Sequence, residues 1–364
     1  MAGDRFDELQ QLCTAAGDKA SLAIATVALQ ADHAFQGRMG EASRLASEAW
    51  ALVESIGDPT LTVELSSSLI YAKVHCGEWS DALRWSQRVI DLADGDPAKG
   101  NLIFGSPLAI ALATRAIARA FLGRPGWRDD QRHGLAVARS ADPVTYARAV
   151  AWVYLLVAVG LLAADDRAVR ESEDALRMAE RSGDDHGLSI ARLTLGVALV
   201  HRPTDAERDR GQQLLAEVSE MFLRREKNLG DLPGVEVYLA RERARRGDRD
   251  NAIPLMRAAV DQLVREGQLP GVWGIPATGV LAETLLDRGA DADVAEAEAA
   301  IERFAAAPAE EGRVLRDIWL LRLRALLARA HGDAAAYAQF RDRYRDMATS
   351  LGFEGHIAWA EAMP

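Results

Sequence analysis

The stretch "SIGDPTL", from Ser55 to Leu61, contains the joint that decides the fold. Glycine adopts the left-handed conformation that closes a helix, aspartate accepts hydrogen bonds from the first N–H groups of the next helix, and proline fits its first turn. The sequence therefore predicts that one helix ends and another begins here. Variants of the joint recur as "AAGDKAS" from Ala15, "ADGDPAK" from Ala93, "RSADPVT" from Arg139 and "RSGDDHG" from Arg181.

A second kind of turn alternates with this joint. It is a glycine or a short polar turn, then polar residues, then an alanine-rich amphipathic run. Clear examples begin "GRMGEA" at Gly37, "GEWSDAL" at Gly77, "GDRDNAI" at Gly247 and "GDAAAY" at Gly332. Successive turns lie about 40 residues apart, which is the spacing of helix-pair solenoids. The runs place apolar residues at i, i+3, i+4 and i+7, and the alternation typical of strands is almost absent.

The sequence thus predicts an all-α fold, a tetratricopeptide-like α-solenoid of about eight antiparallel helix pairs forming a right-handed superhelix. Each pair needs the next one to bury its apolar face. The first helices of the pairs, the A helices, are predicted at 18–36, 58–76, 106–122, 142–162, 184–201, 232–246, 275–288 and 312–331. The second, the B helices, are predicted at 39–56, 79–93, 127–139, 166–181, 205–226, 249–266, 292–305 and 333–350.

We expect a single helical-repeat domain over residues 1–364. It consists of an orphan B-type helix in 1–17, the pairs in 18–350 and a C-terminal capping segment in 351–364. A solenoid that begins in mid-pair exposes an apolar face unless another element covers it. Two expectations follow: the chain is the C-terminal part of a longer protein, or its first helix docks on a partner.

The composition of the chain indicates which classes of partner and which cellular compartment to expect. The net charge of −11 argues against general affinity for nucleic acid or anionic membranes. Cys13 and Cys76 match no metal or disulfide spacing, which predicts buried thiols in a reducing cytoplasm. The longest apolar run, from Ala149 to Ala164, is shorter than the ~20 residues that span a bilayer. It is in phase with the repeat, so a buried helix is expected.

The sequence contains no recognisable catalytic motif. It has no Walker-type loop, no Gly-x-Gly-x-x-Gly after a strand and no His-Glu-x-x-His. The seven histidines are scattered, mostly at predicted helix ends, where cationic or hydrogen-bonded capping is expected. The sequence therefore predicts a chain without enzyme activity, cofactor or metal.

Arginines on the A helices suggest a binding face. In helix-pair solenoids the A helices line the concave surface, so these arginines could form a groove for an acidic peptide, a nucleotide or RNA. The alternative is that they are solvated or pair with acids on B helices. The arginines are Arg115, Arg119, Arg148, Arg192, Arg241, Arg245, Arg316, Arg322 and Arg324.

Two irregular joints stand out beside them. "QLPGVWGIPATG", from Gln268, carries Trp273 and resembles "NLGDLPGVE", from Asn228. Long joints at the edge of a solenoid often meet partners, but a tryptophan there more often fills a gap between repeats. Trp127, in "LGRPGWRDD", is expected to be a hydrophobic anchor. The predicted partner-binding residues are Arg115, Arg119, Arg148, Arg192, Arg241, Arg245, Trp273 and Arg316.

The turns "GEWSDAL" and "GDRDNAI" resemble the tetratricopeptide turn, in a degenerate, MalT-like form. Longer phrases, among them "LASEAWALVESIGDPTLTVEL", "ARRGDRDNAIPLMRAAVDQL" and "SLGFEGHIAWAEAMP", are similar to the C-terminal region of large actinobacterial, especially mycobacterial, regulators. That family joins a class III adenylate or guanylate cyclase domain to an AAA-type, STAND-like ATPase, with a LuxR-type DNA-binding domain in some relatives. The resemblance implies repeats that receive an input and regulate the ATPase or cyclase. This sequence has neither cyclase aspartates nor a P-loop, so no catalytic residue is transferred.

The leading hypothesis is a cytoplasmic, non-catalytic scaffold whose partner is another protein or a cognate ATPase or cyclase domain. The alternatives are a small-molecule effector sensor of a transcriptional regulator, with its site near the A-helix arginines and the Trp273 joint, and part of an adenylate cyclase whose catalytic domain lies outside this chain. Neither a membrane nor a nucleic acid is expected as a partner.

Overall fold

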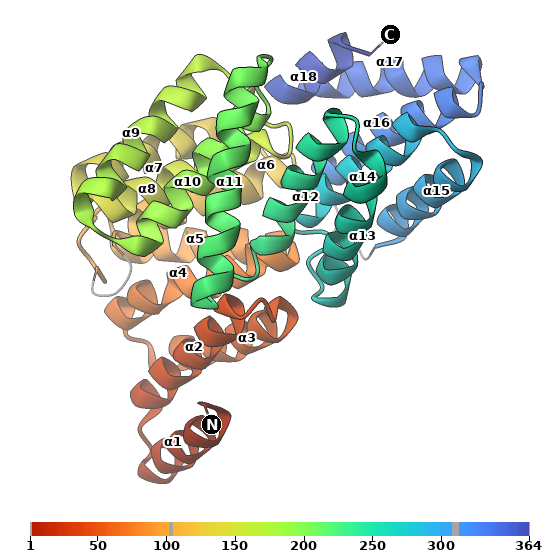
Figure 1. The fold of residues 1–364 in the computed structure, drawn as a ribbon. Helices are drawn as coiled ribbons and strands as arrows, with labels where there is room; N and C mark the ends of the chain where they lie inside the picture. The colour runs from red at the N-terminus through yellow and green to blue at the C-terminus, as the bar shows by residue number, and fades with distance from the viewer. Residues whose placement is uncertain (1, 102–104, 308–312, 364) are drawn as a thin grey trace.

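The computed structural model describes residues 2–101, 105–307 and 313–363. Within these ranges the regular elements are eighteen α-helices and one short 3-10 helix, with no strand (Figure 1). The chain is an α-solenoid, as predicted. Within the described residues, no helix combines the length and apolar character needed to cross a membrane.

The helices alternate between the two predicted types. The A helices are α2 (Lys19–Phe35), α4 (Pro59–Cys76), α6 (Pro107–Phe121), α8 (Pro143–Tyr154), α10 (Asp185–Val200), α12 (Leu232–Arg245), α14 (Gly274–Arg288) and α16 (Val314–Ala330). The B helices are α3 (Met39–Ile56), α5 (Trp79–Ala93), α7 (Trp127–Ala141), α9 (Asp166–Ser182), α11 (Asp205–Arg225), α13 (Arg249–Arg265), α15 (Asp291–Ala306) and α17 (Ala334–Leu351). The flanking helices are α1 (Ala2–Ala16) and α18 (Glu354–Glu361). The predicted start at 312 lies outside the described residues.

The Gly-Asp-Pro joint behaves as its residue types predict. Gly57 ends α3 with φ of +72°, in the left-handed region. The carboxylate of Asp58 accepts from the N–H groups of Thr60, at 2.8 Å, and Leu61, at 3.2 Å. Pro59 occupies the first turn of α4. One helix therefore stops and the next starts within three residues.

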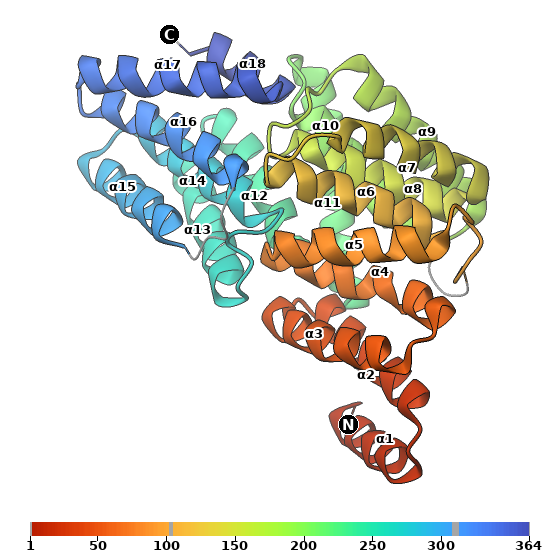
Figure 2. The same ribbon diagram turned by 180° about the vertical axis from the view of Figure 1, so that it is seen from behind.

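The A helices form the inner layer of the solenoid. Each packs on its B partner and also on the A helices before and after it, from α2 to α16. Helices α6, α10 and α14 are consequently buried around most of their circumference, whereas α9 buries a single narrow stripe. The two ends of the molecule, α1 and α18, lie far apart (Figure 2).

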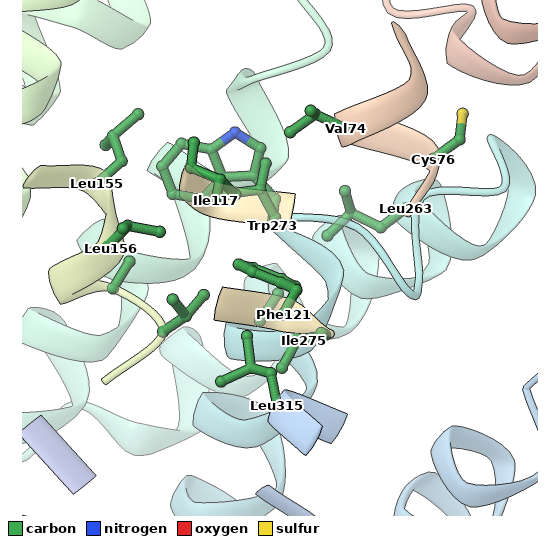
Figure 3. Packing of buried hydrophobic residues seen from close by; sticks show 14 of the residues in the cluster. Val74, Cys76, Ile117, Phe121, Leu155, Leu156, Leu263, Trp273, Ile275 and Leu315 are labelled. Carbon is green, nitrogen blue, oxygen red and sulfur yellow. The ribbon is translucent and has the colours of Figure 1, made fainter. Parts of the chain in front are cut away.

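The superhelix turns tightly enough that distant repeats touch. The indole N–H of Trp79, at the start of α5, donates to the carbonyl of Pro270, which is 191 positions away, at 3.2 Å. The rings of Trp79 and Phe121 lie 3.9 Å apart between centroids. Phe121 lies beside Ile275 and Leu315 from the C-terminal third in the main core (Figure 3). A single apolar cluster therefore joins the early and late repeats.

The A helix predicted at 142–162 is wrong in its second half. Helix α8 ends at Tyr154, and the chain continues as the 3-10 helix η1 (Leu155–Val157) and then without helical structure to Asp165. The apolar residues of this half are buried as expected. We call residues 155–161 the irregular segment.

Residues far along the chain donate hydrogen bonds to the backbone carbonyl groups of the irregular segment. These bonds explain why the segment is not helical. The carbonyl of Ala158 accepts from the hydroxyl of Tyr238 at 3.0 Å, and that of Val159 from the indole of Trp319 at 3.2 Å. The next two carbonyls accept backbone N–H groups at the start of α18. These bonds replace the ones a helix would have made. Gly160, at φ of +77°, has no room for a side chain.

The two cysteines are buried and unpaired, as predicted. Burial, with a smaller contribution from Glu78, raises the pKa of the Cys76 thiol to about 12. That thiol donates to the carbonyl of Met39 at 3.3 Å. Trp127 is also buried and packs edge-on against Phe353, 6.4 Å away between ring centroids. It is a hydrophobic anchor, as the sequence indicated.

Candidate binding cavity between the A helices

A cavity opens on the inner face of the solenoid, between α2, α4, α8 and α10 and the two irregular joints. Its empty space is about 800 Å³, including open solvent at its mouth. Phe35, Tyr71, Trp152 and Trp273 supply aromatic walls, and alanine and leucine side chains supply much of the rest. We call it the central cavity. Its mainly apolar lining with a few polar groups is that of a ligand site.

A buried carboxylate organises one wall of the central cavity. Asp231 accepts hydrogen bonds from the indole of Trp273 at 2.7 Å, the imidazole of His75 at 2.9 Å and the hydroxyl of Tyr71 at 3.0 Å. Burial alone would raise the pKa of Asp231, but its interactions with these three groups leave that pKa below its ordinary value. The wall is therefore a fixed, ionised network.

The two irregular joints meet at this wall. Asp231 is the N-cap residue of α12, yet its side chain does not cap that helix and turns to α4 and to Trp273 instead. Trp273 is 1% exposed, and Gly234 leaves room for its ring. Trp273 therefore fills a gap between repeats, and its ring also lines the central cavity.

Arg148 brings a positive charge into the central cavity. It lies on α8, and burial lowers the pKa of its guanidinium to about 10, although Tyr71 and two aspartates favour its charged form. It remains a cation at neutral pH. The neighbouring His186 is neutral there, because burial and then the charge of Arg148 lower its pKa to about 4. An acidic group on a ligand would meet a favourable site.

The other predicted residues lie elsewhere. Arg115 and Arg119 both bind the buried carboxylate of Asp130 on α7, at 2.5 and 2.7 Å. Arg192 lies 3.4 Å from Glu217 on α11. Arg316 donates to the carbonyl of Ala307 at 3.2 Å. Arg241 and Arg245 line a second cavity nearer the C-terminus. The structure thus divides the predicted set: Arg148 and Trp273 share the central cavity, and the remainder do not join them.

Sequence reasoning missed most of the polar and aromatic residues of the central cavity, including the four whose chemistry is described above. Tyr71 and His75 stand four positions apart on α4, and His186 and Asp231 look like ordinary residues of helix starts. The signal that was available is a tyrosine and a histidine four positions apart, on one face of an A helix. Of the expected cationic or hydrogen-bonded caps, the cationic part is wrong for His186, His201 and His356, because burial is the largest cause that lowers the pKa of each. His201 is nevertheless a hydrogen-bonded cap, since it ends α10 and its ring bonds to the carbonyl of Val197 at 2.7 Å.

These three histidines predict acid sensitivity. Unfolded imidazoles take up a proton near pH 6.5, whereas His186 in the folded chain does so only near pH 4. The unfolded state therefore binds more protons between those values, and stability falls as the pH drops through that window. For His186 alone the loss is about 3 kcal/mol by pH 4. Urea unfolding at a series of pH values between about 7.5 and 4 measures it.

Two variants make this measurement specific. His201→Asn removes one of these three imidazoles and should flatten the pH profile, while His133→Asn, at an exposed position, should leave its slope unchanged. Equal unfolding free energies at pH 7 and pH 5 would contradict the expectation.

Comparison with known proteins gives the fold. No protein-family model and no curated protein matches the chain. A Rap protein crystallised in complex with competence and sporulation factor superposes with a TM-score of 0.55, at 11% identity, over 94% of this chain and 96% of that one. The apo form of RapI gives a TM-score of 0.47, at 10% identity, over 97% and 99% of the two chains. A circular tandem repeat protein gives 0.24, at 16% identity, over 98% and 92%. The first of these supports a shared helical-repeat architecture.

Proposed function

We propose that the chain is a non-catalytic interaction module that holds a short amphipathic segment of a protein partner in the central cavity, and that this binding regulates the partner. The central cavity carries the proposal, because it is the place where the inner A helices leave a mainly apolar space beside a buried cation. A fold of this type holding another molecule has a precedent in the Rap protein crystallised with competence and sporulation factor.

The chemistry of the walls defines the segment. Aromatic rings from α2, α4 and α8 suit apolar side chains, and Arg148 suits one acidic group. Asp231 is already engaged by three donors, so it holds the wall rigid rather than competing for the ligand's own donors. The expected ligand therefore carries apolar side chains and one carboxylate.

A displayed library of short random peptides, selected on the full chain, tests the proposal. Selected peptides should be rich in apolar residues with an acidic residue or a free C-terminal carboxylate. Two variants should weaken their binding at least tenfold: Arg148→Met, which removes the charge, and Ala151→Phe, which fills the cavity. Ala335→Phe, the same enlargement at an exposed position on α17, is the control. Peptides that bind all four chains equally, or no enrichment, would refute it.

The resemblance to cyclase and ATPase regulators supports a more specific version, in which the module regulates an ATPase or cyclase domain. Detection of the native protein in its source cells with an antibody against this region tests that version. A mass well above the 39.5 kDa of this chain agrees with it. A mass near that value counts against a covalently joined domain. ATP or GTP turnover by the purified chain that persists through repurification would contradict the non-catalytic proposal.

A further inference from the structure

A second cavity lies on the inner face, between α10, α12, α14, α16 and α18. Its empty space is about 930 Å³, including open solvent. Four guanidinium groups line it, against two carboxylates, those of Glu283 and Asp287. The four are Arg241, Arg245, Arg249 and Arg322. We call it the arginine cavity. The chain as a whole has a net charge of −11, so this cavity is a positively charged region on a negatively charged protein.

The two carboxylates do not neutralise the arginines. Glu283 accepts from Arg322 at 2.6 Å, so it offsets that one guanidinium. Burial, and then the nearby charge of Glu283, raise the pKa of Asp287, whereas Arg249, Arg329 and Arg322 favour its ionised form; Asp287 is thus a single carboxylate beside the three other arginines of the cavity. Arg241, Arg245 and Arg249 are therefore left without an equal number of negative charges in the cavity.

Arg241 and Arg245 form its most charged part. Both donate to the same carbonyl oxygen, that of Val200 at the end of α10, at 2.6 and 3.3 Å. Arg245 also donates to Glu242 at 3.0 Å, and the Nε of Arg241 lies 3.5 Å from the same carboxylate oxygen, so the two guanidinium groups share one carboxylate. Burial and then the neighbouring Arg241 lower the pKa of Arg245. Two like charges held this closely are stabilised by an anion placed between them.

Aromatic rings stand beside these charges. The guanidinium of Arg241 lies 4.9 Å from the ring centroid of Tyr238, and that of Arg322 lies 5.2 Å from the ring centroid of Trp359. Trp359 is partly exposed and packs against Trp319, 5.4 Å away between centroids. Aromatic faces and guanidinium planes both stack on planar rings. The cavity thus offers a charged part and a stacking part.

We propose that the arginine cavity binds a phosphate-bearing small molecule of nucleotide size, with its phosphate at Arg241, Arg245 and Arg249 and its planar ring at Trp359. A charged part beside an aromatic part suits a ligand that has both a phosphate and a planar ring. The bidentate fork of arginine matches phosphate oxygens. This site is separate from the central cavity and does not depend on the function proposed there.

Calorimetry of the full chain with adenosine monophosphate, adenosine and inorganic phosphate tests the proposal. Adenosine monophosphate should bind at least tenfold more tightly than either of the other probes. Its affinity should fall as the salt concentration rises, because the phosphate contact is electrostatic. Absence of measurable binding at millimolar nucleotide, or equal affinity for adenosine, would overturn the proposal.

Variants then locate the site. Arg245→Gln and Arg249→Gln should each weaken nucleotide binding at least fivefold. Arg246→Gln is the matched control, because Arg246 adjoins Arg245 but forms its ion pair with Asp209 on α11. Arg249 is exposed on α13, so its variant remains informative if Arg245→Gln fails to fold. Loss of binding in Arg246→Gln alone would overturn the assignment. Ala151→Phe should leave nucleotide binding intact, which separates this result from the test of the central cavity.

Discussion

Gly271→Ala is expected to lower the free energy of unfolding by about 3 kcal/mol or more. A Cβ atom at this position would lie 1.7 Å from the carbonyl oxygen of His75 and 2.6 Å from its carbonyl carbon. Both are backbone atoms at the end of α4, so neither can turn aside as a side chain would. The joint before α14 must therefore move away from α4, which also separates Trp79 from Pro270. Urea unfolding measures the loss.

Gly40→Ala is the matched control for this substitution. Its Cβ would lie 3.4 Å from the nearest atom, the carbonyl oxygen of Glu266, which is an ordinary contact. Gly40 is in α3, where alanine is preferred over glycine by up to about 1 kcal/mol, so this variant should be neutral or slightly more stable. If Gly271→Ala unfolds at the same urea concentration as Gly40→Ala, the close approach of the joint to α4 does not exist in solution.

Trp273→Ala is expected to cost about 3–5 kcal/mol. The side chain is 1% exposed and belongs to the main core, where Ile117 lies beside it (Figure 3). Its removal leaves a void and also takes one of three hydrogen-bond donors from the buried carboxylate of Asp231. Chemical unfolding of the variant measures the sum of the two effects.

Trp273→Phe separates those two effects. Phenylalanine keeps most of the apolar volume but cannot donate to Asp231, so we expect a smaller cost, about 1–2 kcal/mol. If the two variants lose equal stability, the hydrogen bond dominates and the packing argument is wrong. If neither variant loses more than about 1 kcal/mol of unfolding free energy, the Trp273 side chain contributes little to the stability of the joint.

The helices could be predicted closely from the sequence because their signals are local. Apolar spacing marks each helix, and the glycine and aspartate of each joint mark its ends. The bounds predicted for α3 and α5 coincide with those observed, and most others differ by one or two residues. The curling of the solenoid onto itself was not predicted, since it depends on contacts such as Trp79 to Pro270 between distant positions.

The structure of the irregular segment could not be predicted from its own sequence. An apolar run from Leu155 to Leu161 has the composition of a buried helix, and nothing within it indicates that Tyr238 and Trp319 will bind its carbonyls. The choice between helix and irregular structure is made by residues about 80 and 160 positions away. A single sequence gives no means of pairing them.

The cavities were predictable only in part for the same reason. The preference for A-helix arginines led to Arg148, Arg241 and Arg245, which do line cavities, but also to Arg115 and Arg119, which bind Asp130. The residue type is the same in each case, and the difference lies in which acid the fold brings near. Asp231 escaped notice because its position is that of a helix cap, although its side chain does not cap that helix.

The irregular segment also affects which parts of the chain unfold together. Repeat arrays commonly open a few repeats at a time, because each repeat is held only by its neighbours. Here Tyr238 of α12, Trp319 of α16 and the first turn of α18 all bond to residues 158–161 beside α8. Opening the last repeats therefore removes hydrogen-bond partners from the middle of the chain. We therefore expect the middle and the C-terminal end to unfold as one cooperative unit, with their slowest amide hydrogens exchanging together, and α1, which packs mainly on α2, to fray separately.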